Sequence, residues 1–419
     1  MKRKRLVITG LGAVCPSGNS VPELWNSLSN GRSGIDTLPE PLLSELSDNP
    51  TKYGGVVKNL QPETFLEKKL LRKMDKLSIY TTKAAIECVE SSCMKLNQSK
   101  RYRCGCVMGV GIGGMESYNN GVIAYKDRGW KSIPVMTISK IIPNSTNSNI
   151  ALHFPYLNGI NYSVNTACSS SSDAIAAAAR HILLDEADFM LAGGAETSLT
   201  GFGVSSFNVL HALSTKWSHD PTKASRPFDK DRDGFVMSEG AAVIALESLE
   251  HAEQRNAPIL AELVGFANTN DGYHYTAPDP DAHGIVRAMH CALEQAAIDP
   301  SAIDYINAHG TSTPTNDPLE TQAIKKVFKE YAYTVKISST KSMTGHCVGA
   351  TGAIEAIACI KAIEKQFLPP TINLDTPDTD CDLDYIPHKG IAHKVEYAMS
   401  NTLGFGGHNS VLIFKSYQQ

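Results

Sequence analysis

A lone cysteine stands where a helix is expected to begin, in the stretch NTACSSSSDAIAAAA that runs from Asn165 to Ala179. Ser, Thr and Asp favour the first turn of a helix because their side chains cap unpaired N–H groups, and the alanines favour its continuation. We therefore expect Cys168 at or just before a helix N-terminus, where aligned peptide dipoles stabilise a thiolate. The pattern fits a nucleophile, but it also fits a small buried cysteine in a tightly packed place.

Two histidines stand in loops rich in Gly and Thr, each after a short predicted strand. His309 lies in NAHGTST and His346 lies in KSMTGHCVG. Open α/β sheets build their sites at such strand ends. A single histidine is usually structural, but two in similar settings, together with Cys168, indicate a common site. Lys341 precedes His346 in the second loop and could set its hydrogen bonding, or it could be an exposed cation.

A third glycine-rich stretch, NTLGFGGHN, runs from Asn401 to Asn409. Its glycines allow the backbone to approach a ligand closely and to adopt positive φ angles. A backbone N–H group around Phe405 could then stabilise an oxyanion. A tight turn between two strands is the other interpretation.

Two further motifs are incomplete. MGVGIGG, Met108 to Gly114, has the glycine spacing of a dinucleotide site, but no second strand with an acidic end follows at the required distance. The segment from Asp229 to Gly240 begins like a calcium loop, but Glu239 comes one position too early. We therefore expect no nucleotide and no bound metal, and we interpret the second segment as a charged structural turn.

Composition restricts the class of protein. The chain has 419 residues, 42% of them hydrophobic and 20% charged, which is typical of a soluble globular protein with two domains or one large two-part domain. The net charge of −4 gives no general attraction to nucleic acid, and no apolar run is long enough for membrane insertion. The start is not expected to be a secretory signal, because Gly10 and Gly12 interrupt its apolar run; a β-strand from Arg5 to Thr9 is expected there instead. The ten cysteines show no disulfide-like spacing, which favours reduced thiols in the cytoplasm.

Two parts of the chain share one pattern. Short β-rich runs alternate with helical runs throughout, which predicts an α/β layered fold. TACSSSSDAIAAAARHIL with FMLAGGAET, and TGHCVGATGAIEAIACIKAI with NTLGFGGHN, each give a small-residue turn, an Ala/Ile-rich helix and a strand that ends in glycines. These helices, expected from Ser172 to Leu184 and from Ala350 to Glu364, lack a polar face, so we expect them between layers. If the halves are related, Cys168 and His346 occupy matching helix starts and could face each other.

The stretch EKKLLRKMDK, Glu67 to Lys76, places a basic patch on a predicted helix. A solvated helix face is the ordinary interpretation. In an acidic chain the same patch could also bind an acidic partner.

Together these motifs resemble the β-ketoacyl-[acyl-carrier-protein] synthases, most of all the type II enzymes of bacterial fatty acid synthesis. TACSSS, NAHGTST, KSMTGH and GFGG occur in the family's order with RPFDKDRDGFVMSEGAA and PPTINLD, and the similarity covers nearly the whole chain. The resemblance implies an α/β thiolase-like fold, with two pseudo-repeated halves in a five-layered αβαβα sandwich. Residues 1–255 would carry the nucleophile and residues 256–419 the two histidines. The resemblance also implies a homodimer.

The resemblance assigns roles to residues of this chain. Cys168 matches the acyl-accepting nucleophile, and its backbone N–H, with that of Phe405, matches the oxyanion hole. His309 and His346 match the pair that promotes malonyl decarboxylation, and Lys341 matches a lysine that supports them. The other matches are the gate and wall of an acyl pocket, the contact with the pantetheine arm and the carrier-protein docking surface: Phe405, Ile112 and Phe207; Thr311 and Thr313; Lys68, Lys69, Arg72 and Lys73.

The family's reaction is a decarboxylative Claisen condensation. An acyl group moves to the cysteine, the malonyl carrier loses CO2, and the resulting carbanion attacks the acyl-cysteine to give a 3-oxoacyl carrier. The resemblance implies acyl carrier protein as partner and neither a metal nor a redox cofactor. Two residues depart from the family pattern: His408 stands where Thr is common, and Cys347 where a larger aliphatic residue is usual.

Four other functions are weighed against this one. The serines after Cys168 resemble those of polyketide ketosynthases, so a free-standing enzyme of that kind stays open. A non-catalytic chain-length partner subunit is a second alternative, although such subunits lose the nucleophile. A thiolase would carry a cysteine where Phe405 stands, and a cysteine hydrolase would need a water-activating base.

Overall fold

Strand order divides the central sheet into two halves of one design. The structure is a computed structural model that describes residues 4–418. Its ten-stranded sheet has the order β10-β9-β13-β14-β8-β1-β7-β6-β4-β5. From each edge inward, three strands run parallel and the next two each reverse direction. The strands of the first half are β1 (Leu6–Val14), β4 (Cys104–Val110), β5 (Asn161–Val164), β6 (Phe189–Glu196) and β7 (Gly240–Ser248), and those of the second are β8 (Ala261–Asn270), β9 (Tyr305–Asn307), β10 (Lys336–Ser338), β13 (Tyr397–Gly404) and β14 (His408–Lys415).

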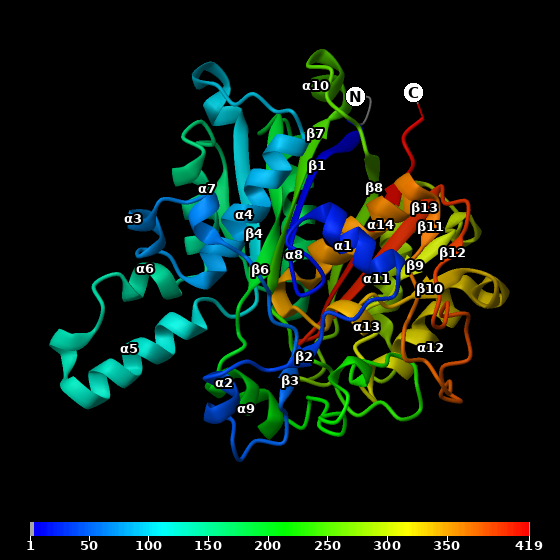
Figure 1. Ribbon diagram of the computed structural model, residues 1–419. Coiled ribbons are helices and arrows are strands. Elements are labelled where there is room, and N and C mark those ends of the chain that lie inside the picture. The colour runs from blue at the N-terminus through cyan, green and yellow to red at the C-terminus, as the bar shows by residue number, and fades with distance from the viewer. Residues whose placement is uncertain (1–3, 419) are drawn as a thin grey trace.

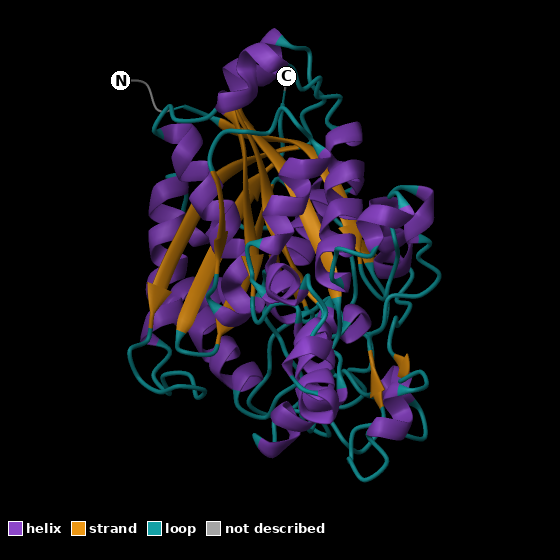
Figure 2. Cartoon of the chain, turned by 90° about the vertical axis from the view of Figure 1, so that its left-hand side faces the viewer, coloured by secondary structure: helices purple, strands orange, loops and turns teal. Residues whose placement is uncertain are grey.

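Helices complete a five-layered sandwich (Figure 2). The helices α8 (Ser170–Leu183) and α14 (Thr351–Lys365) pack against each other in the middle layer, between the two halves of the sheet. The outer layers contain α4 (Lys76–Ser91) and α7 (Ser145–His153) on one side, and α11 (His283–Ala296) and α12 (Asn316–Phe328) on the other. One apolar core surrounds the middle helices and a further core lies under each outer layer. The predicted α/β thiolase-like architecture is confirmed.

The buried middle helices follow from their sequences. Both consist largely of Ala and Ile, so they carry no polar face that would require water. The predicted helix from 172 to 184 and the one from 350 to 364 each agree with the structure within two residues. The halves meet where β1 pairs with β8, through Val7 with Glu262 and Ile8 with Ala261.

Two predicted elements differ in length. The opening strand, expected from 5 to 9, continues to Val14 because a bulge between Ile8 and Gly10 lets the pairing with β7 resume. The basic stretch from 67 to 76 is not one helix: α3 (Lys68–Leu71) is a single turn, and α4 begins anew where the Asp75 side chain caps the Leu77 N–H.

The remaining elements lie around the sandwich. Figure 1 shows α5 and α6 extending away from its body, and the first and last described segments of the chain near the pole that carries α10. Among residues 4–418, every helix is too short or too polar to cross a membrane. The remaining helices and strands are α1 (Val21–Ser29), α2 (Leu42–Glu45), α5 (Met115–Arg128), α6 (Thr137–Ile141), α9 (Gly201–Val209), α10 (Leu249–Gln254), α13 (Lys341–Thr344), β2 (Asp36–Thr37), β3 (Tyr53–Gly54), β11 (Phe367–Leu368) and β12 (Ile391–Ala392).

Candidate active site

Two matching turns introduce the middle helices. The 3-10 turn η4 (Ala167–Ser169) leads directly into α8, and η8 (Val348–Ala350) leads directly into α14. Each turn begins with a residue in the left-handed region, Ala167 at φ 50° and Val348 at φ 39°. Cys168 therefore lies just before a helix, as predicted. Its counterpart in the second turn is Gly349, whereas His346 comes earlier in the chain, so the predicted equivalence of Cys168 and His346 is wrong.

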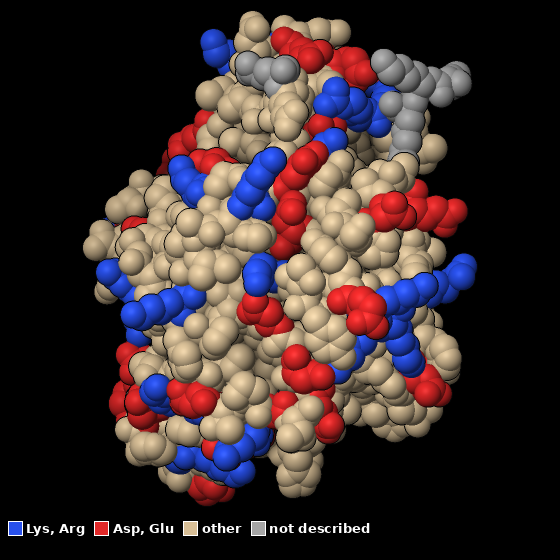
Figure 3. Space-filling model, turned by 90° about the vertical axis from the view of Figure 1, so that its right-hand side faces the viewer, with Lys and Arg blue, Asp and Glu red and all other residues tan. Residues whose placement is uncertain are grey.

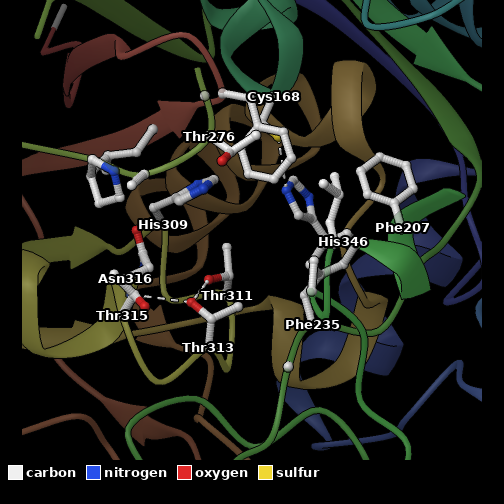
Figure 4. Close-up of a pocket in the computed structure, with 18 of the residues that line it drawn as sticks. Cys168, Phe207, Phe235, Thr276, His309, Thr311, Thr313, Thr315, Asn316 and His346 are labelled. Carbon is white, nitrogen blue, oxygen red and sulfur yellow. Dashed lines mark hydrogen bonds between the residues drawn. The ribbon is translucent and has the colours of Figure 1, made fainter. Parts of the chain in front are cut away.

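The cysteine and both histidines nevertheless converge (Figure 4). His346 Nε2 lies 3.2 Å from Cys168 Sγ, and its Nδ1 lies 2.9 Å from Thr351 Oγ1. When the Thr351 hydroxyl donates to Nδ1, the ring proton resides on Nε2 and faces the sulfur. The His309 ring stands at 87° to the His346 ring, with 5.4 Å between centroids. Thus two imidazoles and a thiol from opposite halves of the chain share one site.

Burial keeps the histidines neutral. It is the largest cause that lowers the pKa of His309 and of His346 well below the usual range, and the Lys341 ammonium lowers both further. Burial raises the pKa of the Cys168 thiol to about 12, although Lys341 and the backbone amides of Phe405 and Cys168 lower it. Desolvation thus outweighs the helix-start effect that predicted a thiolate, and the resting nucleophile is a thiol.

Lys341 acts at a distance from the rings. Its side chain is buried, and its Nζ donates to Glu355 on α14. Burial raises the pKa of Glu355 to about 8, while Lys341 lowers it. The structure therefore places Lys341 in the site as a buried charge paired with a carboxylate. No motif pointed to Glu355, because the pairing crosses from one helix to another.

A second unforeseen carboxylate fixes the His309 loop. Glu320 on α12 is fully buried and accepts hydrogen bonds from the backbone N–H groups of His309 and Gly310, both at 2.8 Å. Asn401 Nδ2 donates to the same carboxylate at 3.2 Å. Each of these contacts joins residues at least ten positions apart in the chain, so motif spacing alone gave no signal.

The loop GFGG lies over the nucleophile. Gly404 approaches so closely that a Cβ there would lie 3.2 Å from the Cys168 N atom and 2.8 Å from the Thr166 carbonyl oxygen. Gly406 and Gly407 follow at φ 81° and 76°, values that favour glycine. The backbone N–H groups of Phe405 and Cys168 both lower the pKa of the Cys168 thiol. These two donors converge on the position where an acylated cysteine would develop negative charge.

A cavity of about 290 Å³ opens over these groups. Cys168, His309, His346, Phe405 and Phe207 all line it. The Phe207 and Phe405 rings lie 6.4 Å apart, which places an apolar pair beside the thiol.

The cavity has a polar side that is rich in hydroxyl groups. Thr311 and Thr313 line it and are joined by a 2.9 Å hydrogen bond, as Figure 4 shows. Thr276 also lines it, although no motif drew attention to that residue. Phe235, which the sequence placed within a charged turn, stacks edge-on against His346 at 5.1 Å.

Ile112 is not brought to this cavity. The residue is 41% exposed, and its backbone N–H donates to Glu196.

The predicted structural turn from Asp229 to Gly240 is held together by a buried carboxylate. Asp229 is fully buried and accepts hydrogen bonds from Arg226 Nε at 2.9 Å and from the backbone N–H of Asp231 at 2.8 Å. That turn is structural, as predicted.

The four basic residues predicted for docking, Lys68, Lys69, Arg72 and Lys73, are all exposed, on and just after α3. In Figure 3, which views the molecule from its opposite side, Lys and Arg side chains alternate with Asp and Glu side chains. The face in that view offers an acidic partner no continuous basic surface.

This chain combines two layered halves, a matching pair of turns and a cysteine that shares its site with two neutral histidines. These features define the thiolase-like class of acyl-condensing proteins. Comparison with protein families agrees. Residues 3–252 match the family described as "Beta-ketoacyl synthase, N-terminal domain", and residues 260–375 match "Beta-ketoacyl synthase, C-terminal domain". The chain belongs to the β-ketoacyl synthase family.

Individual relatives extend over the full chain. The "3-oxoacyl-[acyl-carrier-protein] synthase 2" of Coxiella burnetii is 43% identical over 413 residues, covering 99% of each chain, and that of Synechocystis sp. is 41% identical over 418 residues, covering 100% of this chain and 99% of its own. Among solved structures, a β-ketoacyl synthase from Burkholderia phymatum has a TM-score of 0.91 at 35% identity, covering 99% of this chain and all of its own. A type II PKS ketosynthase in complex with its acyl-carrier protein gives 0.91 at 34%, with both chains fully covered.

Proposed function

We propose that this chain is a 3-oxoacyl-[acyl-carrier-protein] synthase of type II, which condenses an acyl-cysteine with malonyl carrier protein and so extends a fatty acyl chain. The observation that carries the proposal is the 3.2 Å approach of His346 Nε2 to Cys168 Sγ, with His309 in the same cavity. Residues 1–255 supply the nucleophile and residues 256–419 supply the histidines. Full-length relatives named for this activity support it.

Acyl transfer is the first half-reaction. Cys168 attacks the carrier thioester, and the N–H groups of Cys168 and Phe405 stabilise the tetrahedral oxyanion. The bond from carbonyl carbon to carrier sulfur breaks, and the thiol proton of Cys168 leaves with the carrier thiol. Burial raises the pKa of the Cys168 thiol, so the thiolate must be stabilised as it forms. The two backbone N–H groups and the Lys341 charge provide this stabilisation, because each of them lowers that pKa.

Condensation is the second half-reaction. The malonyl carboxylate leaves as CO2, and the thioester oxygen of the resulting enolate accepts hydrogen bonds from the neutral rings of His309 and His346. The enolate carbon then attacks the acyl carbon on Cys168, and the carbon–sulfur bond breaks to give the 3-oxoacyl carrier. One proton from solution restores the Cys168 thiol. Thiol, imidazoles and backbone amides supply every group these steps need, so the proposed reaction requires neither a metal nor a redox cofactor.

The partner in this proposal is an acyl carrier protein, which delivers substrate on a phosphopantetheine arm. Thr311 and Thr313 line the cavity and would contact that arm, and Lys68, Lys69, Arg72 and Lys73 would offer positive charge to an acidic carrier. The related ketosynthase solved with its acyl-carrier protein supports a carrier as partner.

We further propose a homodimer in the cytoplasm. Strand β5 ends the sheet with an open edge, and large apolar side chains are exposed on and between α5 and α6, Val135 at 97% and Trp130 at 70%. A second copy that covers this surface would explain both features. All ten cysteines are free thiols, which fits a reducing compartment. Light scattering should give twice the chain mass of 45.2 kDa, and a monomeric mass would refute the dimer.

Intact-protein mass spectrometry tests the activity. The purified chain is mixed with acyl carrier proteins of several chain lengths, then with malonyl carrier, with Cys168→Ala as the control. The expected result is an acyl adduct on wild-type protein only, discharged as a 3-oxoacyl carrier two carbons longer. Repeated extension without reduction would identify a polyketide-type enzyme instead. A folded protein that forms no adduct with any donor would refute the enzyme and favour a partner subunit.

A further inference from the structure

A buried carboxylate that the proposed reaction does not use lies beside the turn that follows His346. Glu196 is the last residue of β6 and is fully buried. Its Oε2 accepts hydrogen bonds from the backbone N–H of Ile112 at 3.2 Å and of Gly349 at 3.4 Å, and Ser198 Oγ donates to Oε1 at 2.5 Å. The carboxylate therefore joins the loop after β4, in one half, to the η8 turn of the other half.

The turn that Glu196 holds is strained and tightly packed. Val348 is β-branched yet adopts φ 39°, a conformation that costs about 1–3 kcal/mol and persists only when its surroundings enforce it. A Cβ on Gly349 would lie 2.3 Å from the Gly111 N atom, so the backbones of the two halves are in direct contact. The Val348 side chain lines the catalytic cavity. A loss of support at Gly349 would therefore reach the cavity wall.

The pseudo-two-fold relation gives Glu196 a counterpart. Gly349 corresponds to Cys168, and the strand that corresponds to β6 is β13, which ends at Gly404. In one half, a carboxylate at the strand end accepts the Gly349 N–H. In the other half, glycine at the strand end leaves the Cys168 N–H free of any carboxylate and open to a substrate oxyanion. The fold thus contains two related anion-accepting turns, one filled by the protein and one open.

We propose that Glu196 is a positioning residue: its carboxylate is a resident anion in the counterpart of the oxyanion hole, and it holds the Val348 turn, and through it His346, in the geometry that decarboxylation requires. This inference rests on the function proposed above. Burial raises the pKa of Glu196 to about 7, against the lowering effect of Ser198 and the backbone amides. The hydrogen bonds from Ser198 and the backbone amides therefore favour the ionised carboxylate of Glu196, whereas burial favours its protonated form.

The substitution Glu196→Gln tests the role, because it keeps the shape of the side chain and removes the negative charge that strengthens both backbone hydrogen bonds to Oε2. Acylation of Cys168 and decarboxylation of malonyl carrier are measured separately. We expect decarboxylation to slow about 10- to 100-fold and acylation to change by less than about threefold, since loss of a charge-assisted hydrogen bond acts mainly on the His346 turn. Equal slowing of both half-reactions, or no slowing of either, would overturn the proposal.

Glu87→Gln is the matched control. Glu87 also accepts two backbone N–H groups, from Ala13 at 3.0 Å and Val21 at 2.8 Å, and it does not line the catalytic cavity. Both half-reactions should stay within about threefold of wild type in this variant.

Amide hydrogen exchange over residues 341–352 supplies a readout that needs no turnover. It should accelerate about tenfold or more in Glu196→Gln and stay unchanged in Glu87→Gln. Unchanged exchange in Glu196→Gln refutes the positioning role, whereas a wild-type protein without elongation activity refutes the proposed function.

Discussion

Buried carboxylates lie at both ends of the sandwich, and their surroundings differ. Glu247 lies opposite Phe189 in register, at the end of the sheet where β6 begins and where α10 covers it. It accepts hydrogen bonds from Thr9 Oγ1 at 2.5 Å, from His251 Nδ1 at 2.6 Å and from Arg255 Nε at 2.8 Å. Burial raises the pKa of Glu247, but Arg255, His251 and Thr9 together bring it below the usual range. This carboxylate is a satisfied anion.

Glu355, at the catalytic end, has fewer partners. It is bound by Lys341 through one oxygen, while its Oε2 has no hydrogen-bond partner among the described residues. The same holds, within residues 4–418, for the buried oxygens Asn307 Oδ1 and Asn401 Oδ1. Burial raises the pKa of Glu355 to about 8. The catalytic end therefore keeps neutral or half-paired groups where the opposite end completes its pairing.

The difference shows that the catalytic end of the fold contains buried polar groups that lower its stability. Unpaired buried polar groups each destabilise a protein by about 1–3 kcal/mol, and they concentrate at functional sites. The Glu247 cluster has no chemistry to perform, so its pairing can be complete. The Lys341–Glu355 pair keeps a positive charge near two histidines that must stay neutral. Four experiments test this contrast.

The largest effect should come from Lys341→Met. Lys341 lowers the pKa of His309, His346 and the Cys168 thiol, so its loss raises all three and leaves Glu355 unpaired. We expect condensation to slow about 100- to 1,000-fold, as when one stabilising donor is removed from an active site. Steady-state kinetics across pH would measure this loss. Lys336→Met, which removes a half-exposed pair with Asp384, is the control, and equal activity of the two variants would contradict the role.

Arg255→Met should affect stability and not catalysis. It leaves Glu247 buried with two partners instead of three, and breaking such a pair costs about 3–5 kcal/mol. Urea unfolding would measure the loss, while activity of the folded fraction should stay within about twofold of wild type. Arg5→Met, whose pair with Glu262 is half exposed on the Arg5 side, should cost less than about 1 kcal/mol. If the two variants lose equal stability, the buried Glu247 cluster stabilises the fold no more than a half-exposed ion pair does.

The two carboxylates should respond to pH in opposite directions. The folded pKa of Glu355 lies above its unfolded value, so its contribution is present at low pH and is lost as pH rises toward about 8. The folded pKa of Glu247 lies below its unfolded value, so its contribution is present at neutral pH and is lost as pH falls. Relative to wild type, Glu355→Gln should therefore gain stability as pH rises from about 5 to about 8, whereas Glu247→Gln should be less stable at neutral pH and recover that loss only as pH falls below about 4, each by on the order of 1 kcal/mol. Parallel curves in urea titrations would reject the contrast.

The smallest effect on activity is expected from the exposed basic residues of the predicted docking surface. Reversing Lys68 and Lys69 to Glu should raise KM for the carrier about three- to tenfold without changing stability, since both side chains are exposed. Salt near 1 M should abolish the difference, because it shortens the screening length to about 3 Å. Reversing Lys95 and Lys100, also exposed, is the control and should leave KM unchanged. A salt-independent effect would rule out electrostatic docking.

Local sequence preferences predicted much of this architecture. Serines and alanines after Cys168 indicated where α8 begins, and the Ala/Ile composition of both middle helices indicated that they are buried. The repeated pattern led to the approach of Cys168 and His346 even though the equivalence drawn between them was wrong. These successes share a cause, because each depends on residues that are close in the chain.

The features that escaped prediction depend on distant residues. Glu355 and Glu320 reach the site from other helices, and a left-handed Val348 contradicts the preference of its residue type. The thiol pKa depends on burial, which a motif does not report. The resemblance assigned Ile112 to the wall of the acyl pocket. Ile112 does not line the cavity described above, so that role remains a prediction.

The position of α8 and α14 has a consequence for synthesis on the ribosome. Each helix forms part of the core of both halves, so neither half can bury its own apolar surface alone. When the strands of the first half have been translated, the face of α8 that packs on α14 is still uncovered, and α14 ends only at Lys365. The nascent chain must therefore expose Ala- and Ile-rich surface over that interval, and we expect chaperones that bind apolar segments to recognise it there.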